Sequence, residues 1–353
     1  MKIQYTFLLF WFGLLSLSAQ NELYVSPTFE QGNDKYSDLQ AAVDAATSGD
    51  IIYIYPGGYA GTITVNKSLS LIGRGYRIAE NYPAANTSLS DAKIATLVLE
   101  EDADNSLVQG MKIDRLKILG ADDCLVARNY LEGLLIMNAT SATVRQNYLL
   151  GESQISTGDM GCSNSYSFPI VTSNNGDLII KNNILKGFLG NNFNITLWYD
   201  RDCAGAYTAN IDFQHNYSQG KISFPPTSIY VANNQIATLS SSTFNLSSYD
   251  QYGVIKNNVG KTVIMPSGNN YISSWNSEFS QSGNSFDAQY QLLPTAESKN
   301  YATDGGDVGP FGGTNPYKLS GVTALPFIYQ LNVPDEATTG GGMPVSVKVK
   351  TGN

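Results

Sequence analysis

The sequence predicts an all-β protein: a right-handed parallel β-helix (solenoid) with a short N-terminal capping helix and a C-terminal β-hairpin extension. Three observations predict this fold. An Asn-centred phrase recurs at intervals of one or two coils, one amphipathic helix precedes the first strands, and the composition is that of short strands joined by many turns. Charged residues make up 14% of the chain and 33 residues are glycine, which is typical of a turn-rich β protein.

The first twenty residues have the layout of a secretory signal peptide. Lys2 precedes an apolar run from Phe7 to Leu17, and small residues ending at Ala19 follow it. The run is about half the length that a membrane-spanning helix needs. We therefore expect residues 1–20 to direct export, and the mature protein to be secreted or held at the cell surface without spanning a membrane.

The balance of charge argues against nucleic acid as a partner. The formal net charge is −9 and the isoelectric point is about 4.6. Binding to a polyanion backbone needs clustered Lys and Arg, which this composition does not favour. The hydrophobic fraction of 42% is ample for a packed core.

The three cysteines are compatible with an oxidising compartment. Cys124, Cys162 and Cys203 allow at most one disulfide within a monomer, so at least one thiol stays unpaired. None of them has the CxxC spacing of a zinc site, and we predict no zinc. Which two would pair stays open.

One segment near the N-terminus has the periodicity of an amphipathic helix. It spans Tyr36–Thr47, with Ser37 and Gln40 spaced as a capping box and Gly49 closing its end. Three short alternating strands follow, over residues 49–59, 62–65 and 68–73. The apolar face of the helix comprises Leu39, Ala42, Val43 and Ala46.

A repeated phrase, in which apolar or β-branched residues lead into asparagine, organises the middle of the chain. Successive asparagines are 18, 36, 33, 18, 24 and 12 residues apart, so most gaps are one or two units of about 18 residues. That unit is too short for paired helices and fits three short strands with their turns. We expect each asparagine to adopt the left-handed conformation of a corner and to bond the asparagine of the next coil. The repeated residues are Asn129, Asn147, Asn183, Asn216, Asn234, Asn258 and Asn270.

Several of these segments resemble the pectin-lyase-like proteins, a family of right-handed parallel β-helices. Residues 37–46, 49–59 and 67–73 are similar to the N-terminal cap and first coils of that family. The segment Asp304–Gly313 is similar to the exit signature of its secreted bacterial members, and the ending through Asn353 resembles secreted proteins of the Bacteroidetes. The resemblance implies the fold; because that fold hosts lyases, hydrolases and adhesins, it implies no single function.

Hydrolases of this family imply an Asn-Thr-Asp triplet, an Asp-Asp pair and a His-Gly pair. Asp122 and Asp123 form the adjacent acidic pair of the middle coils, but the triplet is absent. The sole histidine, His215, precedes Asn216 rather than glycine. It also occupies the position that asparagine fills in the other repeats, so we expect it to have a structural role in a turn. The hydrolase pattern is therefore missing.

Lyases of this family imply a calcium ion that acidifies a uronate proton and an unprotonated Arg or Lys that removes it. The acidic run Glu100–Asn105 could supply oxygen ligands, although it lacks the spacing of an EF-hand loop. A solvated turn is the alternative for this run, and we predict no resident metal or cofactor. Cations that could lie nearby, or could simply solvate an outer face, are Lys112, Arg115, Lys117 and Arg128.

The segment between Leu197 and Cys203 interrupts the asparagine rhythm and predicts a projecting loop. Its aromatic residues could stack on sugar rings while its charged residues bond hydroxyl groups. The alternative is that the aromatics pack the loop onto the solenoid and that Arg201 pairs with its neighbours. The candidate ligand-binding residues are Trp198, Tyr199, Asp200, Arg201 and Asp202.

We divide the chain into a signal peptide (1–20), a β-helix with its cap (21–313) and a C-terminal β extension (314–353), with the coil stack over residues 51 to about 293. The extension predicts two strands, over 326–333 and 344–351, that cover the open end of the solenoid or act in sorting. The sequence favours a non-catalytic protein that binds polysaccharide or cell-surface glycans or mediates adhesion. The alternatives are a lyase acting on acidic polysaccharide and an inert structural surface protein.

Overall fold

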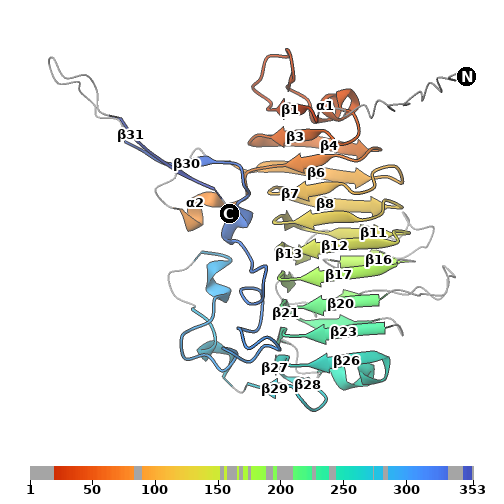
Figure 1. Cartoon of the computed structure of the whole chain (residues 1–353), viewed down its shortest axis with the longest axis vertical. Coiled ribbons are helices and arrows are strands. Elements are labelled where there is room, and N and C mark those ends of the chain that lie inside the picture. Colours follow the sequence, from red (N-terminus) through yellow and green to blue (C-terminus); the bar gives the residue numbers. More distant parts are fainter. Residues whose placement is uncertain are drawn as a thin grey trace, which may run out of the picture.

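The chain winds into stacked coils whose strands pair in parallel with those of the coils above and below (Figure 1). This is the right-handed parallel β-helix that the sequence predicts. The computed structural model describes residues 20–82, 90–151, 155–156, 165–166, 170–173, 176–187, 194–196, 210–224, 228–237, 244–272, 274–280, 285–332 and 345–351.

One face of the solenoid is an 11-stranded sheet, almost entirely parallel and in chain order after its first strand. Its strands are short, because each turns a corner after two to five residues. In spatial order they are β2 (Lys35–Tyr36), β1 (Glu22–Val25), β3 (Ile51–Ile54), β5 (Ser70–Ile72), β7 (Leu107–Gln109), β9 (Cys124–Ala127), β12 (Ser141–Arg145), β17 (Asp177–Lys181), β20 (Asn210–Gln214), β23 (Ser228–Ala232) and β26 (Gly253–Lys256).

The other two faces belong to a 14-stranded sheet that bends around a corner at the long strands β4, β6 and β8. On one face lie β10, β13, β18, β21, β24, β27 and β29, and on the other lie β11, β16, β19 and β22. Their bounds are β4 Gly57–Val65, β6 Ala92–Leu99, β8 Lys112–Leu119, β10 Tyr130–Leu131, β11 Leu134–Met137, β13 Tyr148–Gly151, β16 Ile170–Ser173, β18 Ile184–Gly187, β19 Asn194–Thr196, β21 Tyr217–Gln219, β22 Lys221–Ser223, β24 Gln235–Ala237, β27 Val259–Lys261 and β29 Asn270–Tyr271.

The remaining elements are short and lie at the ends or outside the coils. Two are α-helices and four are 3-10 helices within the described residues. They are α1 (Leu39–Ala45), α2 (Ile78–Asn81), η2 (Leu246–Tyr252), η3 (Trp275–Ser277), η4 (Ala288–Tyr290) and η5 (Leu319–Gly321), with the strand pairs β14 (Ile155–Ser156) with β15 (Ser165–Tyr166), β25 (Phe244–Asn245) with β28 (Val263–Ile264), and β30 (Phe327–Asn332) with β31 (Ser346–Lys350).

Alternation of side chains builds the interior. In β12, Ala142 and Val144 are buried while the alternate residues of the strand face outward, as the period of two in a strand requires. The parallel register then places Val144 beside Val126 of the coil before and Ile180 of the coil after. The core is therefore a stack of aligned apolar rows.

The predicted N-terminal helix is present, but its start differs from the predicted capping box. The N-cap of α1 is Asp38, whose carboxylate accepts the backbone N–H of Ala41 at 2.8 Å. Gln40 instead bonds Thr64 through both its side-chain oxygen and its nitrogen. Ser37 is therefore not the cap, because the aspartate one residue later offers the stronger, charged acceptor.

An asparagine ladder runs along one buried corner. The backbone N–H and Nδ2 of Asn147 both donate to Oδ1 of Asn183, at 2.9 and 3.1 Å, and Nδ2 of Asn183 donates to the carbonyl of Val144 at 2.9 Å. The predicted ladder is confirmed, except that its last member is Asn269 rather than Asn270. The other members are Asn129, Asn216, Asn234 and Asn258.

The left-handed residue of each corner is the one before the ladder asparagine, where φ lies between 52° and 62°. The prediction that the ladder asparagine adopts this conformation is wrong by one residue. The left-handed residue turns the chain and points its side chain outward, which leaves the asparagine to point inward. These residues, here called the corner row, are Arg128, Gln146, Asn182, His215, Asn233 and Asn257.

After β29 the chain leaves the coils and runs back along the outside of the solenoid toward its N-terminal end (Figure 1). The expectation that the coil stack continues to about residue 293 is therefore wrong. We call residues 274–280 and 285–325 the return segment. The corner row bonds it in reverse chain order: Asn257 with Tyr301, Asn233 with Thr303, Asn182 with Pro310 and Gly312, Gln146 with Asn315 and Pro316, and Arg128 with Val322.

A second apolar core fills the space between the return segment and the solenoid. Tyr130 and Tyr148 stack at 5.3 Å on adjacent coils, and Tyr217 packs 4.5 Å from Tyr290 of the return segment. Burial raises the pKa of the tyrosines here, so they stay neutral across the physiological range. The aromatic residues attach the return segment to the coils as firmly as an interdomain core would.

A buried carboxylate, Asp287, joins the early and late parts of the return segment to each other and to α2. Asp287 accepts bonds from Nδ2 of Asn81, the hydroxyl of Tyr317 and the backbone N–H of Ser320, at 2.8, 3.2 and 2.7 Å. Tyr317 also bonds the hydroxyl of Tyr76 at 2.6 Å. Because these donors satisfy the carboxylate, it can be buried at this contact between α2 and the return segment.

The Asp304–Gly313 motif docks against the corner row. The N–H of Gly309 donates to the carbonyl of Asn233 at 2.8 Å, and the last two glycines of the motif lie against His215. A Cβ at Gly312 or Gly313 would come within 3.0 Å of a ring nitrogen of His215. At Gly312 it would also clash with the carbonyl oxygen of Asp307, so these positions leave room for glycine alone.

The C-terminal strands form an antiparallel hairpin, β30 with β31, as expected from their alternation. The hairpin does not cover the end of the last coil. It projects beside the first coils, where Lys350 lies 4.4 Å from the ring centre of Tyr82 (Figure 1). The return segment explains this, since it carries the chain back to the N-terminal end before the hairpin begins.

We expect Asn183→Leu to lower the free energy of unfolding by about 3 kcal/mol or more. The change leaves the N–H of Asn147 and the carbonyl of Val144 unpaired in a buried corner, at about 1–3 kcal/mol for each group. Chemical denaturation measures the loss. Asn245→Leu, an exposed asparagine whose side chain caps no helix, is the matched control and should change stability little. Equal effects of the two changes would show that the ladder bonds are not stabilising.

We expect stability to fall as the pH is lowered from about 7.5 to about 5.5. Burial lowers the pKa of His215, and Lys181 adds to this while Asp304 opposes it. The unfolded chain therefore takes up a proton near pH 6.5 that the folded chain takes up only at lower pH. Calorimetry should show a weaker pH dependence for His215→Asn, which has the side chain of the sibling coils. The same slope in both proteins would contradict this role.

Candidate functional site

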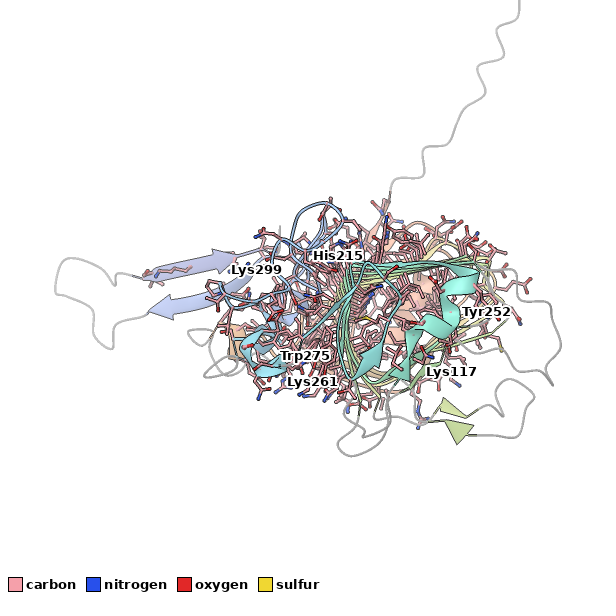
Figure 2. The ribbon with its side chains drawn as sticks, turned by 90° about the horizontal axis from the view of Figure 1, so that it is seen from below. Lys117, His215, Tyr252, Lys261, Trp275 and Lys299 are labelled. Atoms are coloured by element: carbon pink, nitrogen blue, oxygen red, sulfur yellow. The ribbon has the colours of Figure 1, made fainter. Side chains whose placement is uncertain are left out.

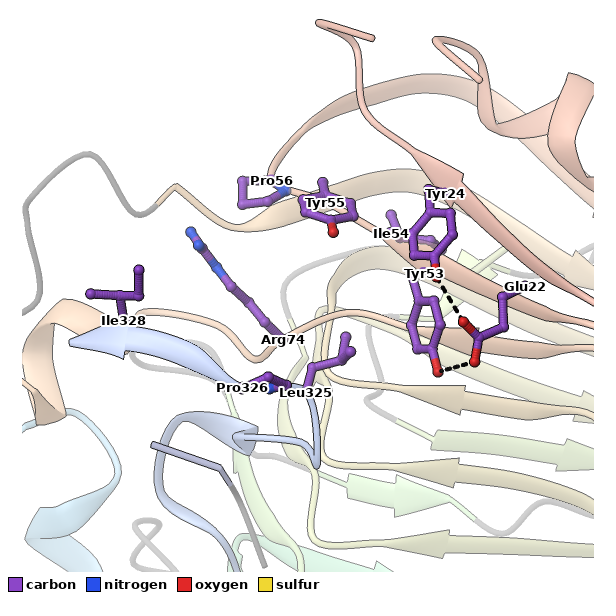
Figure 3. Close-up of a pocket in the computed structure, with 10 residues that line it drawn as sticks. All are labelled: Glu22, Tyr24, Tyr53, Ile54, Tyr55, Pro56, Arg74, Leu325, Pro326 and Ile328. Atoms are coloured by element: carbon purple, nitrogen blue, oxygen red, sulfur yellow. Dashed lines mark hydrogen bonds between the residues drawn. The ribbon is translucent and has the colours of Figure 1, made fainter. Parts of the chain in front are cut away.

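A pocket of 560 Å³ lies where the first coils meet the base of the hairpin (Figure 3). We call it the tyrosine pocket. Strands β1 and β3 supply its aromatic wall, and the loop after β5 supplies a cation. Its lining residues are Glu22, Tyr24, Tyr53, Ile54, Tyr55, Pro56, Arg74, Leu325, Pro326 and Ile328.

Two tyrosines form the aromatic wall because they are register partners. Tyr24 of β1 pairs with Tyr53 of β3, and their rings stack at 5.5 Å with an interplanar angle of 29°. Two residues along the chain, Tyr55 is 45% exposed and makes an edge contact with Phe29. The outer surface of the first coils therefore presents ring faces and edges to solvent.

A carboxylate holds the two stacked rings. Glu22 accepts the hydroxyl of Tyr24 at 2.7 Å and the hydroxyl of Tyr53 at 3.4 Å (Figure 3). The hydrogen bond to Glu22 raises the pKa of Tyr24 to about 12, with burial adding to it, and burial followed by the charge of Glu22 raises the pKa of Tyr53. Both phenols are therefore neutral hydrogen-bonding groups at physiological pH.

Arg74 extends across the pocket between Tyr55 and the start of the hairpin (Figure 3). Its Nη2 donates to the carbonyl of Ser90 at 2.9 Å, while its buried Nε makes no hydrogen bond with the described residues. Burial lowers the pKa of Arg74, and Asp91 opposes that shift. An arginine remains charged under these conditions, so the pocket contains a fixed cation with a donor to spare.

The opposite wall is apolar and comes from the C-terminal part of the chain. Leu325 is half-buried, whereas Pro326 and Ile328 are exposed. Aromatic faces, an apolar wall, a carboxylate and a guanidinium together suit a ligand with ring faces and many hydroxyl groups.

The sequence-predicted site, Trp198, Tyr199, Asp200, Arg201 and Asp202, lies outside the described residues, as do Cys162, Cys203 and the signal-peptide region 1–19. Cys124 is a free, buried thiol, and burial raises its pKa to about 12. A buried thiol with a raised pKa is protonated at physiological pH and is therefore a weak nucleophile. No helix in the described part of the chain is both long and apolar enough to cross a membrane.

Asp104, of the acidic run proposed to supply calcium ligands, and the Asp122–Asp123 pair compared with the hydrolase pattern bond turns of adjacent coils. Asp104 accepts the N–H of Asp122 at 2.7 Å, and Asp122 accepts the N–H of Thr140 at 2.6 Å, one coil further on. Asp123 bonds the hydroxyl of Ser141. Within the described ranges, no group of three or more acidic, His or Cys side chains is placed to hold a metal ion.

The four cations considered as a basic site do not form one cluster. Lys112 pairs with Glu132 at 3.4 Å and lies over the ring of Tyr130. Arg115 and Lys117 share its strand, β8, but Arg128 belongs to the corner row and bonds Gln146 and the return segment. His215 is likewise a corner residue, as the sequence predicted.

No protein-family model matches the sequence, and no curated protein matches it. Among solved structures, the crystal structure of pectate lyase Pel9A is similar to this chain, with a TM-score of 0.47 and 16% sequence identity. The alignment covers 85% of this chain and 98% of that chain.

Sequence reasoning missed the tyrosine pocket, although part of its signal was present. Tyr53 occupies an outward position of a strand predicted from alternation over residues 49–59, and Tyr55 follows that strand, whereas the strand that contains Tyr24 was not predicted. An aromatic residue at an outward position of two successive strands is the pattern that could have indicated a surface site. The contribution of Arg74 and the hairpin could not be found, since it depends on the path of the return segment.

Proposed function

We propose that this chain is a non-catalytic, secreted or surface-exposed β-helix protein that binds glycans, and that the tyrosine pocket is a glycan contact. The observation that carries the proposal is the stacked pair Tyr24 and Tyr53, joined by Glu22 and facing Arg74 across an open pocket. Sugar rings bury their CH faces on aromatic rings while carboxylate and guanidinium groups bond their hydroxyls. Adhesion to a glycan-bearing surface would use the same contact.

We expect Tyr55→Ala to weaken glycan binding by about 1–3 kcal/mol, the scale of losing an aromatic contact at an interface. The purified protein is first screened against neutral and acidic polysaccharides, and the tightest ligand is titrated by calorimetry. Tyr271→Ala is the matched control, because Tyr271 is 59% exposed and belongs to the last strand of the solenoid, far from the pocket. Equal affinity of the two variants would remove the tyrosine pocket from the proposal.

The loop predicted from sequence is tested in the same screen. If Trp198 contacts the glycan, Trp198→Ala should weaken binding by about 1–3 kcal/mol and leave the melting temperature nearly constant. A lowered melting temperature with unchanged binding by the folded fraction would show that the loop only packs on the solenoid.

The screen also tests the catalytic alternative. Each polysaccharide is assayed for new unsaturated or reducing ends. Cleavage that a chelator abolishes would replace the binding proposal with a calcium-dependent lyase, whereas binding without new ends supports the proposal.

A further inference from the structure

A second hollow, of 380 Å³, lies between the solenoid and the return segment, far along the coils from the tyrosine pocket. Strands β18, β21, β24 and β27 form one wall, and the 3-10 helices η3 and η4 form the other. Figure 2 labels Lys261 and Trp275, one from each wall, on the side of the solenoid that the return segment covers. We call this hollow the lysine pocket.

The solenoid wall of the lysine pocket is a single row of side chains. Lys186, Gln219, Ala237 and Lys261 are register partners on four consecutive strands. Adjacent strands lie about 4.8 Å apart, so the Cα atoms of the two lysines are about 14 Å apart along the solenoid axis. The short side chain of Ala237 leaves the hollow between Gln219 and Lys261.

Among the residues that the structure describes, the two lysines have no counter-charge. Neither forms an ion pair or a hydrogen bond among the described residues, although the protein has a net charge of −9. Elsewhere on the described surface, five cations lie 2.5–3.4 Å from a carboxylate, among them Lys181 beside Asp212. Lys186 is half-buried, and burial lowers its pKa, with Arg77 adding to the shift. An unpaired ammonium in such a place costs free energy that a bound anion would recover.

The facing wall is aromatic and rigid. Trp275 and Phe279 pack at 5.4 Å, and both contact Tyr217 of the solenoid. Nε1 of Trp275 is buried and directed at the hydroxyl of Tyr217, so the indole is held in place by the solenoid. Gln219, Asn276 and Gln289 add amide groups at the rim. The wall therefore offers donors and acceptors beside ring surfaces.

We propose that the lysine pocket binds an oligosaccharide segment that carries anionic groups, sulfate or carboxylate. Lys186 and Lys261 each pair with one anionic group, and the amides at the rim bond the ring oxygens between them. The spacing of the lysines selects an extended anion over a point anion such as phosphate. This site is separate from the tyrosine pocket and can fail or succeed independently of it.

The test titrates the full chain by calorimetry with a sulfated, a carboxylated and a neutral oligosaccharide of equal length, and with inorganic phosphate. We expect one of the two anionic ligands to bind, and its affinity to fall about 10-fold with Lys186→Gln or with Lys261→Gln. Comparing the affinities of the sulfated and the carboxylated oligosaccharide identifies which anionic group the pocket binds. Lys256→Gln is the control, because it removes the same charge from a face outside the pocket, where Lys256 lies over Tyr230.

Three results would overturn the proposal. The first is that the neutral oligosaccharide or phosphate binds as tightly as the anionic ones. The second is that Lys256→Gln costs as much affinity as the pocket variants, which would indicate general electrostatic attraction. The third is that both pocket variants bind like the wild type.

The melting temperature of each variant is measured as a control, to show that the variant is folded. Because Lys186 forms no ion pair with the described residues, Lys186→Gln should leave the melting temperature unchanged or raise it, and Lys186→Arg should retain binding. The Tyr55→Ala variant should bind the anionic ligand at the lysine pocket as before, which separates this proposal from the glycan contact at the tyrosine pocket.

Discussion

One ladder asparagine in each coil from Asn129 onward is the constraint on which the rest of the structure depends. Its side chain must satisfy the backbone of the corner before it, so the chain is forced to turn at the residue that precedes it. That residue adopts the left-handed conformation and points outward, where Arg128, Asn182 and Asn257 bind carbonyl groups of the return segment. The hydrogen bonds required inside the solenoid thus place the corner row on its surface, where it binds the return segment.

Both pockets follow from the docking of that returning chain. The solenoid alone presents flat rows of side chains, and a flat sheet face has no concave site. Leu325 and Pro326 close one side of the tyrosine pocket, and Trp275 and Phe279 close one side of the lysine pocket. The coils supply aligned polar and aromatic rows, and the return segment converts two of these rows into concave surfaces.

The fold could be predicted from sequence because it depends on local patterns. The asparagine spacing and the alternation within strands such as Ser141–Arg145 are short-range signals that each coil repeats. The role of His215 was predicted by the same comparison of sibling repeats. The errors at Ser37 and Asn270 are each of one residue, because aspartate competed with serine for the cap and two adjacent asparagines competed for the ladder.

The return segment and both pockets could not be predicted in this way. Residues 274–325 carry no regular period, and their partners are more than one hundred residues away in several places, as for Asn182 with Gly312. The role of Asp104, from the acidic run proposed to supply calcium ligands, could not be predicted for a related reason: the coil repeat places it beside Asp122, whose backbone N–H its carboxylate accepts. The four cations of the proposed basic site do not form one cluster, because Arg128 belongs to the corner row.

The path of the return segment also fixes the order in which the molecule can be completed. Tyr317 meets Tyr76 across 241 residues of sequence, so this contact forms only after the intervening coils have stacked. A repeat array alone could grow coil by coil, each unit stabilised by its neighbour. Until the last segment arrives, however, the growing stack exposes the aromatic strip of Tyr130, Tyr148 and Tyr217, a surface prone to aggregation. The return segment therefore protects this surface: an emerging chain exposes the aromatic strip along one side until residues 274–325 cover it.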